Sequence, residues 1–125
     1  IISIFILVTY NRVMSITISI GHPFVSDHFH DLPGFTEARH GHNWHIEASF
    51  EIQKLEDRSV VHDDVHTWIQ SVDYTLLNDA TEFQGRNPTA ELLSQWACEY
   101  LVSRGHRVTE IRIQEKANYW ARCRP

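Results

Sequence analysis

The chain has 125 residues, 42% of them hydrophobic, with 11 Lys and Arg against 16 Asp and Glu, and therefore a formal charge of -5. This length suits one globular domain, and an acidic chain without a basic cluster excludes nucleic acid or an anionic membrane as the main partner. Two cysteines are too few for a disulfide framework, which favours a reducing, cytoplasmic setting. Nine histidines are unusual, and their placement determines what they indicate.

The first residues, IISIFILV, form the only continuous apolar run, and eight residues are too short to cross a membrane. No positive charge precedes the run, as it would in a signal peptide, because the first basic residue is Arg12. We therefore expect residues 1–13 to be an extension or an extra edge strand, and residues 14–125 to form a single domain.

Alternating apolar residues predict two strands in the first half of the chain. Met14 to Ile20 alternate cleanly, and residues 40–52 alternate again, with His40 and His42 on the face that carries the apolar side chains. The segment between them, residues 21–39, holds two prolines and two glycines among polar residues and is predicted to be a loop.

The apolar period then changes to that of helices. Residues 61–72 carry one apolar stripe, and a second helix is expected after Asn87, with Asn87 as its cap, Pro88 at its first position and Gly105 at its end.

The chain ends in an alternating strand, residues 108–115, and a short strand at 117–122. Ile111, Ile113 and Glu115 share one face of the longer strand, so the carboxylate points toward the core and needs a polar partner there. The expected fold is α+β: a four-stranded antiparallel sheet with two helices on one face. Its open edges favour pairing between subunits.

The pair His40 and His42 is the main candidate for chemistry, because alternate residues of a strand direct both imidazoles to the same side. A catalytic zinc ion takes three protein ligands, so a third must come from elsewhere, and His28 and His30 in the preceding segment are both suppliers. Two histidines at this spacing are also common as plain surface residues of a strand. The apolar face and the intervening glycine favour the metal site.

Three more residues are weaker candidates. Glu37 can act as a general base, although a solvated loop glutamate is the simpler interpretation. Asp73 and Tyr74 follow the first helix, where a carboxylate and a packed aromatic residue are also ordinary. The remaining histidines at positions 45, 62, 66 and 106 are interpreted as structural or exposed.

The sequence resembles the 6-pyruvoyltetrahydropterin synthase / 6-carboxytetrahydropterin synthase family in the order of five features. They are H(28), H-G-H(40–42), V-D-Y-x-x-L-N-D(72–79), N-P-T-A-E(87–91) and Glu115. The resemblance implies a tunnelling fold, in which three subunits close their sheets into a barrel and two trimers form a hexamer. It also implies a Zn2+ cofactor and a pterin substrate. The implied zinc ligands are His28, His40 and His42, while Glu115 anchors the pterin and Thr89 lies near it.

The sequence departs from this family at two positions. The cysteine that most members carry before H-G-H is missing, and Asp73-Tyr74 stands where they have Asp-His. The motif E-x-x-H-G-H, from Glu37 to His42, is similar to a subgroup in which glutamate replaces the cysteine. That subgroup converts 7,8-dihydroneopterin triphosphate to 6-hydroxymethyl-7,8-dihydropterin, with the glutamate as general base.

Other functions remain open at this stage. They are 6-carboxy-5,6,7,8-tetrahydropterin synthase, 6-pyruvoyltetrahydropterin synthase, a paralogue that binds zinc and pterin without turnover, and a structural domain with incidental histidines.

Overall fold

A computed structural model describes residues 14–125, so the expected extension at 1–13 lies outside the described residues. The strands are β1 (Ile16–His28), β2 (Asp31–Leu32), β3 (Phe35–Thr36), β4 (His40–Ile52), β5 (Thr75–Leu76), β6 (Arg107–Lys116) and β7 (Tyr119–Cys123). The helices are α2 (Asp57–Val72) and α3 (Ala90–Ser103), with two short 3-10 turns, η1 (Leu77–Asp79) and η2 (Thr81–Phe83), between them.

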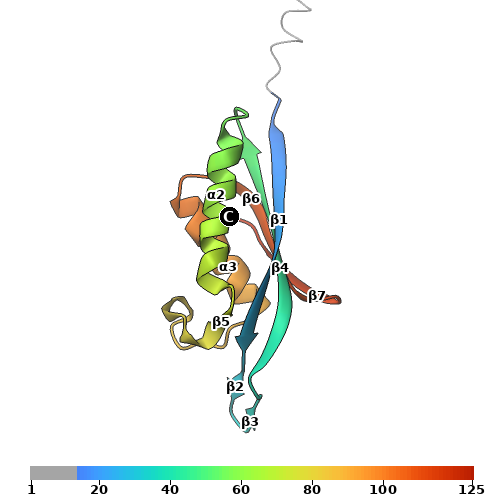
Figure 1. The fold of residues 1–125 in the computed structure, drawn as a ribbon, viewed down its shortest axis with the longest axis vertical. Coiled ribbons are helices and arrows are strands. Elements are labelled where there is room, and N and C mark those ends of the chain that lie inside the picture. Colours follow the sequence, from blue (N-terminus) through green and yellow to red (C-terminus); the bar gives the residue numbers. More distant parts are fainter. Residues whose placement is uncertain (1–13) are drawn as a thin grey trace, which may run out of the picture.

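The main sheet has the strand order β5-β1-β4-β6-β7, and both helices cover one of its faces (Figure 1). This is the predicted α+β arrangement. The four long strands are antiparallel as expected, and the two-residue β5 adds a fifth strand that runs parallel to β1. A single chain leaves the sheet open, because the barrel of a tunnelling fold arises only when subunits assemble.

Strand β1 is longer than predicted, since it continues through Gly21 and Pro23 to His28. The expected loop over residues 21–39 is therefore wrong for its first eight residues. Proline is tolerated here because β1 lies near the sheet edge. Among residues 14–125, its only neighbour besides β4 is β5, which pairs at Ser26 and Asp27 alone. The extension is what carries His28 to a position opposite His40.

Helix α3 is capped by a different residue from the one predicted. The Thr89 hydroxyl accepts a hydrogen bond from the Leu92 backbone N–H, and the helix begins at Ala90. Asn87 instead binds the backbone of Asp31 through both its amide oxygen and its amide nitrogen. Gly105 follows the helix with a φ of 88°, as expected for a residue that ends a helix.

The core lies between the sheet and the helices, where the apolar faces of β4 and β6 meet the stripes of α2 and α3. The largest fully buried side chains include Trp44, Trp68, Phe24 and Phe50. Phe24 stacks on Trp44 with ring centroids 5.9 Å apart and meets Trp68 edge-on. Within residues 14–125, neither helix is long and apolar enough to span a membrane.

Candidate functional site

Three histidines meet at one end of the sheet. The ring centroids of His28, His40 and His42 lie 4.6, 4.8 and 5.0 Å apart, and one nitrogen from each ring falls within 4.8 Å of the other two. His28 pairs with His40 across β1 and β4, and His42 follows two residues later on the same face. The extended β1 and the H-G-H segment therefore assemble the cluster together.

Backbone carbonyls fix the tautomers of two of these rings. Nδ1–H of His28 donates to the Pro88 carbonyl and Nδ1–H of His40 to the Ala38 carbonyl, each over 2.8 Å. Both Nε2 atoms then carry lone pairs, and they lie 3.0 Å apart. Nε2 of His42 is buried and has no hydrogen-bond partner among the described residues. Three converging imidazole nitrogens, two of them with their lone pairs directed inward, fit a bound cation such as zinc.

Burial keeps two of the rings neutral. It lowers the pKa of His28 and of His42, and this effect outweighs the nearby Glu115 carboxylate, which acts to raise both values. The neighbouring histidines lower these pKa values further. Since a metal ion binds only the deprotonated imidazole, the lowered pKa values prepare both rings for coordination near neutral pH.

Glu37 lies beside the cluster. Its Oε1 is 3.6 Å from Nδ1 of His40 and 3.8 Å from Nδ1 of His30, and it is buried without a hydrogen-bond partner in the described chain. Its backbone N–H donates to the His30 carbonyl, which holds the β2–β3 segment against the end of β1. A carboxylate oxygen in this position is free to accept a proton from a ligand.

His30, the alternative third ligand, lies away from the H-G-H pair. It groups with His28 and Glu37, and its Nε2 lies 3.3 Å from the Pro88 carbonyl. The structure thus brings His28 rather than His30 together with His40 and His42.

Glu115 faces the cluster from β6. Its Oε1 lies 3.2 Å from Nε2 of His42 and 3.3 Å from Nε2 of His28, and its side chain is 17% exposed. The register of β6 against β7 shifts between Gln114 and Lys116, which places Glu115 at a bulge, a feature that redirects side chains near sites. The alternation in the sequence predicted this inward direction correctly.

The sequence places Glu91 in the N-P-T-A-E motif but gives no sign that it contacts Tyr119. The Tyr119 hydroxyl donates to a carboxylate oxygen of Glu91 and so joins the start of β7 to the first turn of α3. Burial acts to raise the pKa of Glu91, but this hydrogen bond and others outweigh it and lower the pKa. The same bond raises the pKa of Tyr119. No spacing in the sequence relates the two residues.

Asp73 and Tyr74 lie elsewhere. Asp73 Oδ1 accepts from the Val25 backbone N–H over 2.9 Å, and Tyr74 N–H donates to the Val25 carbonyl over 2.6 Å. The Tyr74 side chain is 84% exposed and lines a small pocket with Asp27 and Arg39, on the sheet face opposite His28. Within one chain, these two residues do not join the histidine cluster.

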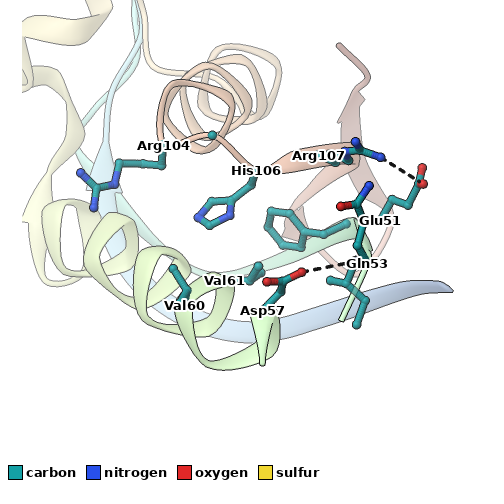
Figure 2. A pocket seen from close by; sticks show the side chains of 11 residues that line it. Glu51, Gln53, Asp57, Val60, Val61, Arg104, His106 and Arg107 are labelled. Atoms are coloured by element: carbon teal, nitrogen blue, oxygen red, sulfur yellow. Dashed lines mark hydrogen bonds and ion pairs between the residues drawn. The ribbon is translucent and has the colours of Figure 1, made fainter. Parts of the chain in front are cut away.

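A separate pocket of about 310 Å³ lies at the other end of β4 (Figure 2). Arg107 pairs with Glu51 there, and Asp57 accepts a hydrogen bond from the backbone N–H of Gln53. The charged side chains that line this pocket therefore largely satisfy one another. Its mixed charges and self-contained pairs give it no evident chemistry, and the histidine cluster remains the candidate site.

The fold and the site define an α+β protein with a candidate metal centre at the end of an antiparallel sheet. The sequence model of the 6-pyruvoyl tetrahydropterin synthase family matches residues 16–125. The chain belongs to this family, whose members are pterin-processing enzymes of the lyase type. None of the curated proteins compared with the chain matches it.

Solved structures share the fold at low sequence identity. The 6-pyruvoyl tetrahydropterin synthase of Caenorhabditis elegans superposes with a TM-score of 0.78 at 16% identity, covering 91% of this chain and 98% of that one. The Plasmodium falciparum enzyme gives 0.67 at 15% identity, covering 90% and 99%. A Plasmodium vivax enzyme in which a catalytic glutamate is replaced by alanine gives 0.69 at 11% identity, covering 90% and 99%.

Proposed function

We propose that this protein is a zinc-dependent lyase that converts 7,8-dihydroneopterin triphosphate to 6-hydroxymethyl-7,8-dihydropterin. In this proposal His28, His40 and His42 hold the zinc ion and Glu37 is the general base. The observation that carries it is the convergence of three imidazole nitrogens beside the buried Oε1 of Glu37, which has no hydrogen-bond partner among residues 14–125. The catalytic glutamate of the Plasmodium vivax relative supports a glutamate base.

Glu37 accepts the proton of the hydroxyl on the second side-chain carbon. As the bond between the first and second side-chain carbons breaks, that oxygen becomes the carbonyl of the leaving aldehyde, and the electron pair passes to the carbon that remains on the pterin. When bound, zinc lowers the pKa of a hydroxyl that coordinates it and so brings the proton within the range of a carboxylate base. Glu37 Oε1 lies 3.6 Å from Nδ1 of His40 and 3.8 Å from Nδ1 of His30, so the carboxylate stands beside the ligands that would hold the metal. A base is most effective when its pKa is matched to that of the proton it removes.

Glu115 anchors the pterin ring in this proposal. A carboxylate accepts two parallel hydrogen bonds from a guanidine-like edge, and Glu115 is positioned at the floor of the site beside His28 and His42. Thr89 caps α3 and follows Pro88, whose carbonyl orients His28. The backbone of Thr89 can therefore contact the pterin that Glu115 anchors.

Asp73 and Tyr74 complete the proposal through assembly. The outer edges of β7 and of the part of β1 before Ser26, which have no partner strand among residues 14–125, pair with further copies of the chain. In the assembled site Tyr74, positioned by Asp73, donates a proton to the side-chain carbon that remains on the pterin. Light scattering of the purified protein should give the mass of a trimer or hexamer. A monomer at micromolar concentration would contradict this part of the proposal.

The central test measures metal content and turnover together. We expect about one zinc per chain bound by the histidine cluster, and formation of 6-hydroxymethyl-7,8-dihydropterin. His42→Ala should lose that zinc and the activity, whereas Glu37→Ala should keep the zinc and lose activity, with Glu37→Gln as the matched control for size. Full activity in Glu37→Ala would refute the base assignment and leave the metal site intact.

Product analysis separates the alternatives. The family match favours 6-pyruvoyltetrahydropterin synthase as a second candidate. The resemblance in the sequence motifs adds 6-carboxy-5,6,7,8-tetrahydropterin synthase, and each of these enzymes has its own product. The missing cysteine favours a paralogue that binds without turnover, which would bind a pterin in a fluorescence titration and yield no product.

A further inference from the structure

A second group of histidines lies away from the candidate site. His22 on β1 and His66 on α2 have ring centroids 4.9 Å apart, and His62 lies 4.5 Å from His66. His22 precedes His28 by six residues along β1, which is about 20 Å at 3.3 Å per residue. The two groups therefore belong to different places on the molecule.

The fold explains why these three side chains meet. His22 shares the helix-facing side of β1 with Phe24, and α2 packs over β1. His62 and His66 are four residues apart in α2, so their side chains lie one above the other on the same face of the helix. A strand and a helix thus supply one and two imidazoles to a shared surface.

The local chemistry suits a cation. Nδ1–H of His22 donates to the Pro23 carbonyl over 2.6 Å, so its Nε2 carries the lone pair, as in histidines oriented for metal binding. The Asp63 carboxylate lies 4.0 Å from Nδ1 of His62 and adds negative charge beside the rings. His62 is 55% exposed, which leaves its ring free to rotate and open to solvent.

We propose that His22, His62 and His66 bind a divalent transition-metal ion at a second site that links β1 to α2. Imidazole ligands select Zn2+, Ni2+ or Cu2+ over Mg2+ or Ca2+, which require oxygen donors. The nitrogens of these three rings do not all lie within 4.8 Å of one another, as those of the first cluster do, so metal binding here requires the exposed His62 ring to turn toward the other two.

The first experiment counts zinc equivalents by calorimetry on the chelator-treated full chain. His62→Gln/His66→Gln should bind one equivalent fewer than the wild type, whereas His45→Gln, on the opposite face of β4, should bind the same number as the wild type. Equal stoichiometry in the wild type and the His62→Gln/His66→Gln variant overturns the proposal. This difference does not depend on what the first site binds, so failure here is distinguishable from failure of the proposed function.

The second experiment tests the link between β1 and α2. In His28→Gln/His40→Gln, which removes the histidine that both ligand groups near the first site share, saturating Zn2+ should raise the urea midpoint of unfolding, because a ligand that binds only the folded state stabilises it. Adding His22→Gln should lower the zinc affinity by at least the about 10-fold loss seen for outer-shell partners. A midpoint that Zn2+ leaves unchanged in His28→Gln/His40→Gln overturns the site.

Discussion

Gly41 separates the two histidines of β4, and the carboxylate of Asp27 explains why it carries no side chain. A Cβ at position 41 would lie 2.7 Å from Asp27 Oδ1, and Asp27 is itself held by Arg39 over 2.8 Å. Gly41→Ala should therefore displace the Asp27–Arg39 pair and the strand ends that carry His28 and His40. Because the side chains of Arg39 and Asp27 are 58% and 37% exposed, we expect a loss of at most about 1 kcal/mol in the free energy of unfolding, measured by urea denaturation.

Two variants control this prediction. Asp27→Ala/Gly41→Ala removes the clash and should recover most of the lost stability. Gly21→Ala meets only the edge of the His45 ring at 3.1 Å, which can move, so its effect should be smaller. If Asp27→Ala/Gly41→Ala were as unstable as Gly41→Ala, the carboxylate would not be the reason for the glycine.

Tyr74 has a φ of 55°, a left-handed conformation that is strained for an aromatic residue. Tyr74→Gly should relieve this strain and leave stability unchanged or raise it by up to about 1 kcal/mol. Gln84→Gly is the matched control, since Gln84 has a φ of 53° and lies away from the site. If Tyr74 takes part in catalysis as proposed, Tyr74→Gly lowers turnover and Gln84→Gly does not; equal turnover in both variants would exclude Tyr74.

Between elements, α2 is tied to the start of β6 by Asp64 and His106. Asp64 Oδ2 lies 2.5 Å from Nε2 of His106, and both side chains are largely buried. Asp64→Asn removes the charge from this bond and should cost about 1.5–3 kcal/mol of unfolding free energy in urea denaturation. Asp63→Asn, whose side chain is 83% exposed, is the control and should change little. Equal effects would show that burial adds nothing to the Asp64 interaction.

The reactivity of Cys98 in α3, which lies beside Cys123 in β7, reports on how tightly α3 packs on β7. Burial and the neighbouring Cys123 raise the pKa of Cys98 from 9.0 to about 11. At pH 8 its thiolate fraction should be about 100-fold below that of an ordinary thiol, so iodoacetamide should modify it correspondingly slowly. Mass spectrometry of time points should show Cys98 reacting as pH approaches 11. Rapid modification of Cys98 at pH 8 would mean that α3 and β7 separate readily.

Hydropathy patterns predicted elements better than their ends. Strong apolar periods predict the strand at 40–52 and both helices. Gly21 and Pro23, residues that usually end a strand, predict an end to β1 that the structure does not have. The cap of α3 was assigned to Asn87 because its side-chain type allows it. Thr89 took that position, since Asn87 is occupied by the backbone of Asp31.

For the whole molecule, the sequence predicted which residues form the candidate site more readily than how they are held. His40 and His42 came from strand alternation, but the carbonyl of Pro88 that orients His28 is sixty residues away from it. The Glu91–Tyr119 bond likewise joins two elements that only the fold brings together. Contacts between residues far apart in the sequence do not depend on the local spacing of apolar residues, so the apolar pattern does not predict them.

The buried histidines link stability of the whole chain to pH. The folded-state pKa values of His28 and His42 lie below 6.5, the ordinary pKa of histidine and the value expected in the unfolded chain. As pH falls through 6.5, the unfolded chain therefore binds more protons than the folded chain. Stability is therefore fully present above pH 6.5 and is lost between that pH and the lowered pKa values. With chelator present, each ring should contribute a slope of up to about 1.4 kcal/mol per pH unit within this window.

Urea unfolding at several pH values between 5 and 8 measures this slope. His28→Gln/His42→Gln should flatten it relative to the wild type, because glutamine does not titrate. Ser26→Ala is the control: it removes a buried hydroxyl that donates to the Val72 carbonyl, and it should lower stability equally at every pH. An unchanged slope in His28→Gln/His42→Gln would mean that the two rings are not buried as neutral groups, and the proposed metal site would then lose its basis in their lowered pKa values.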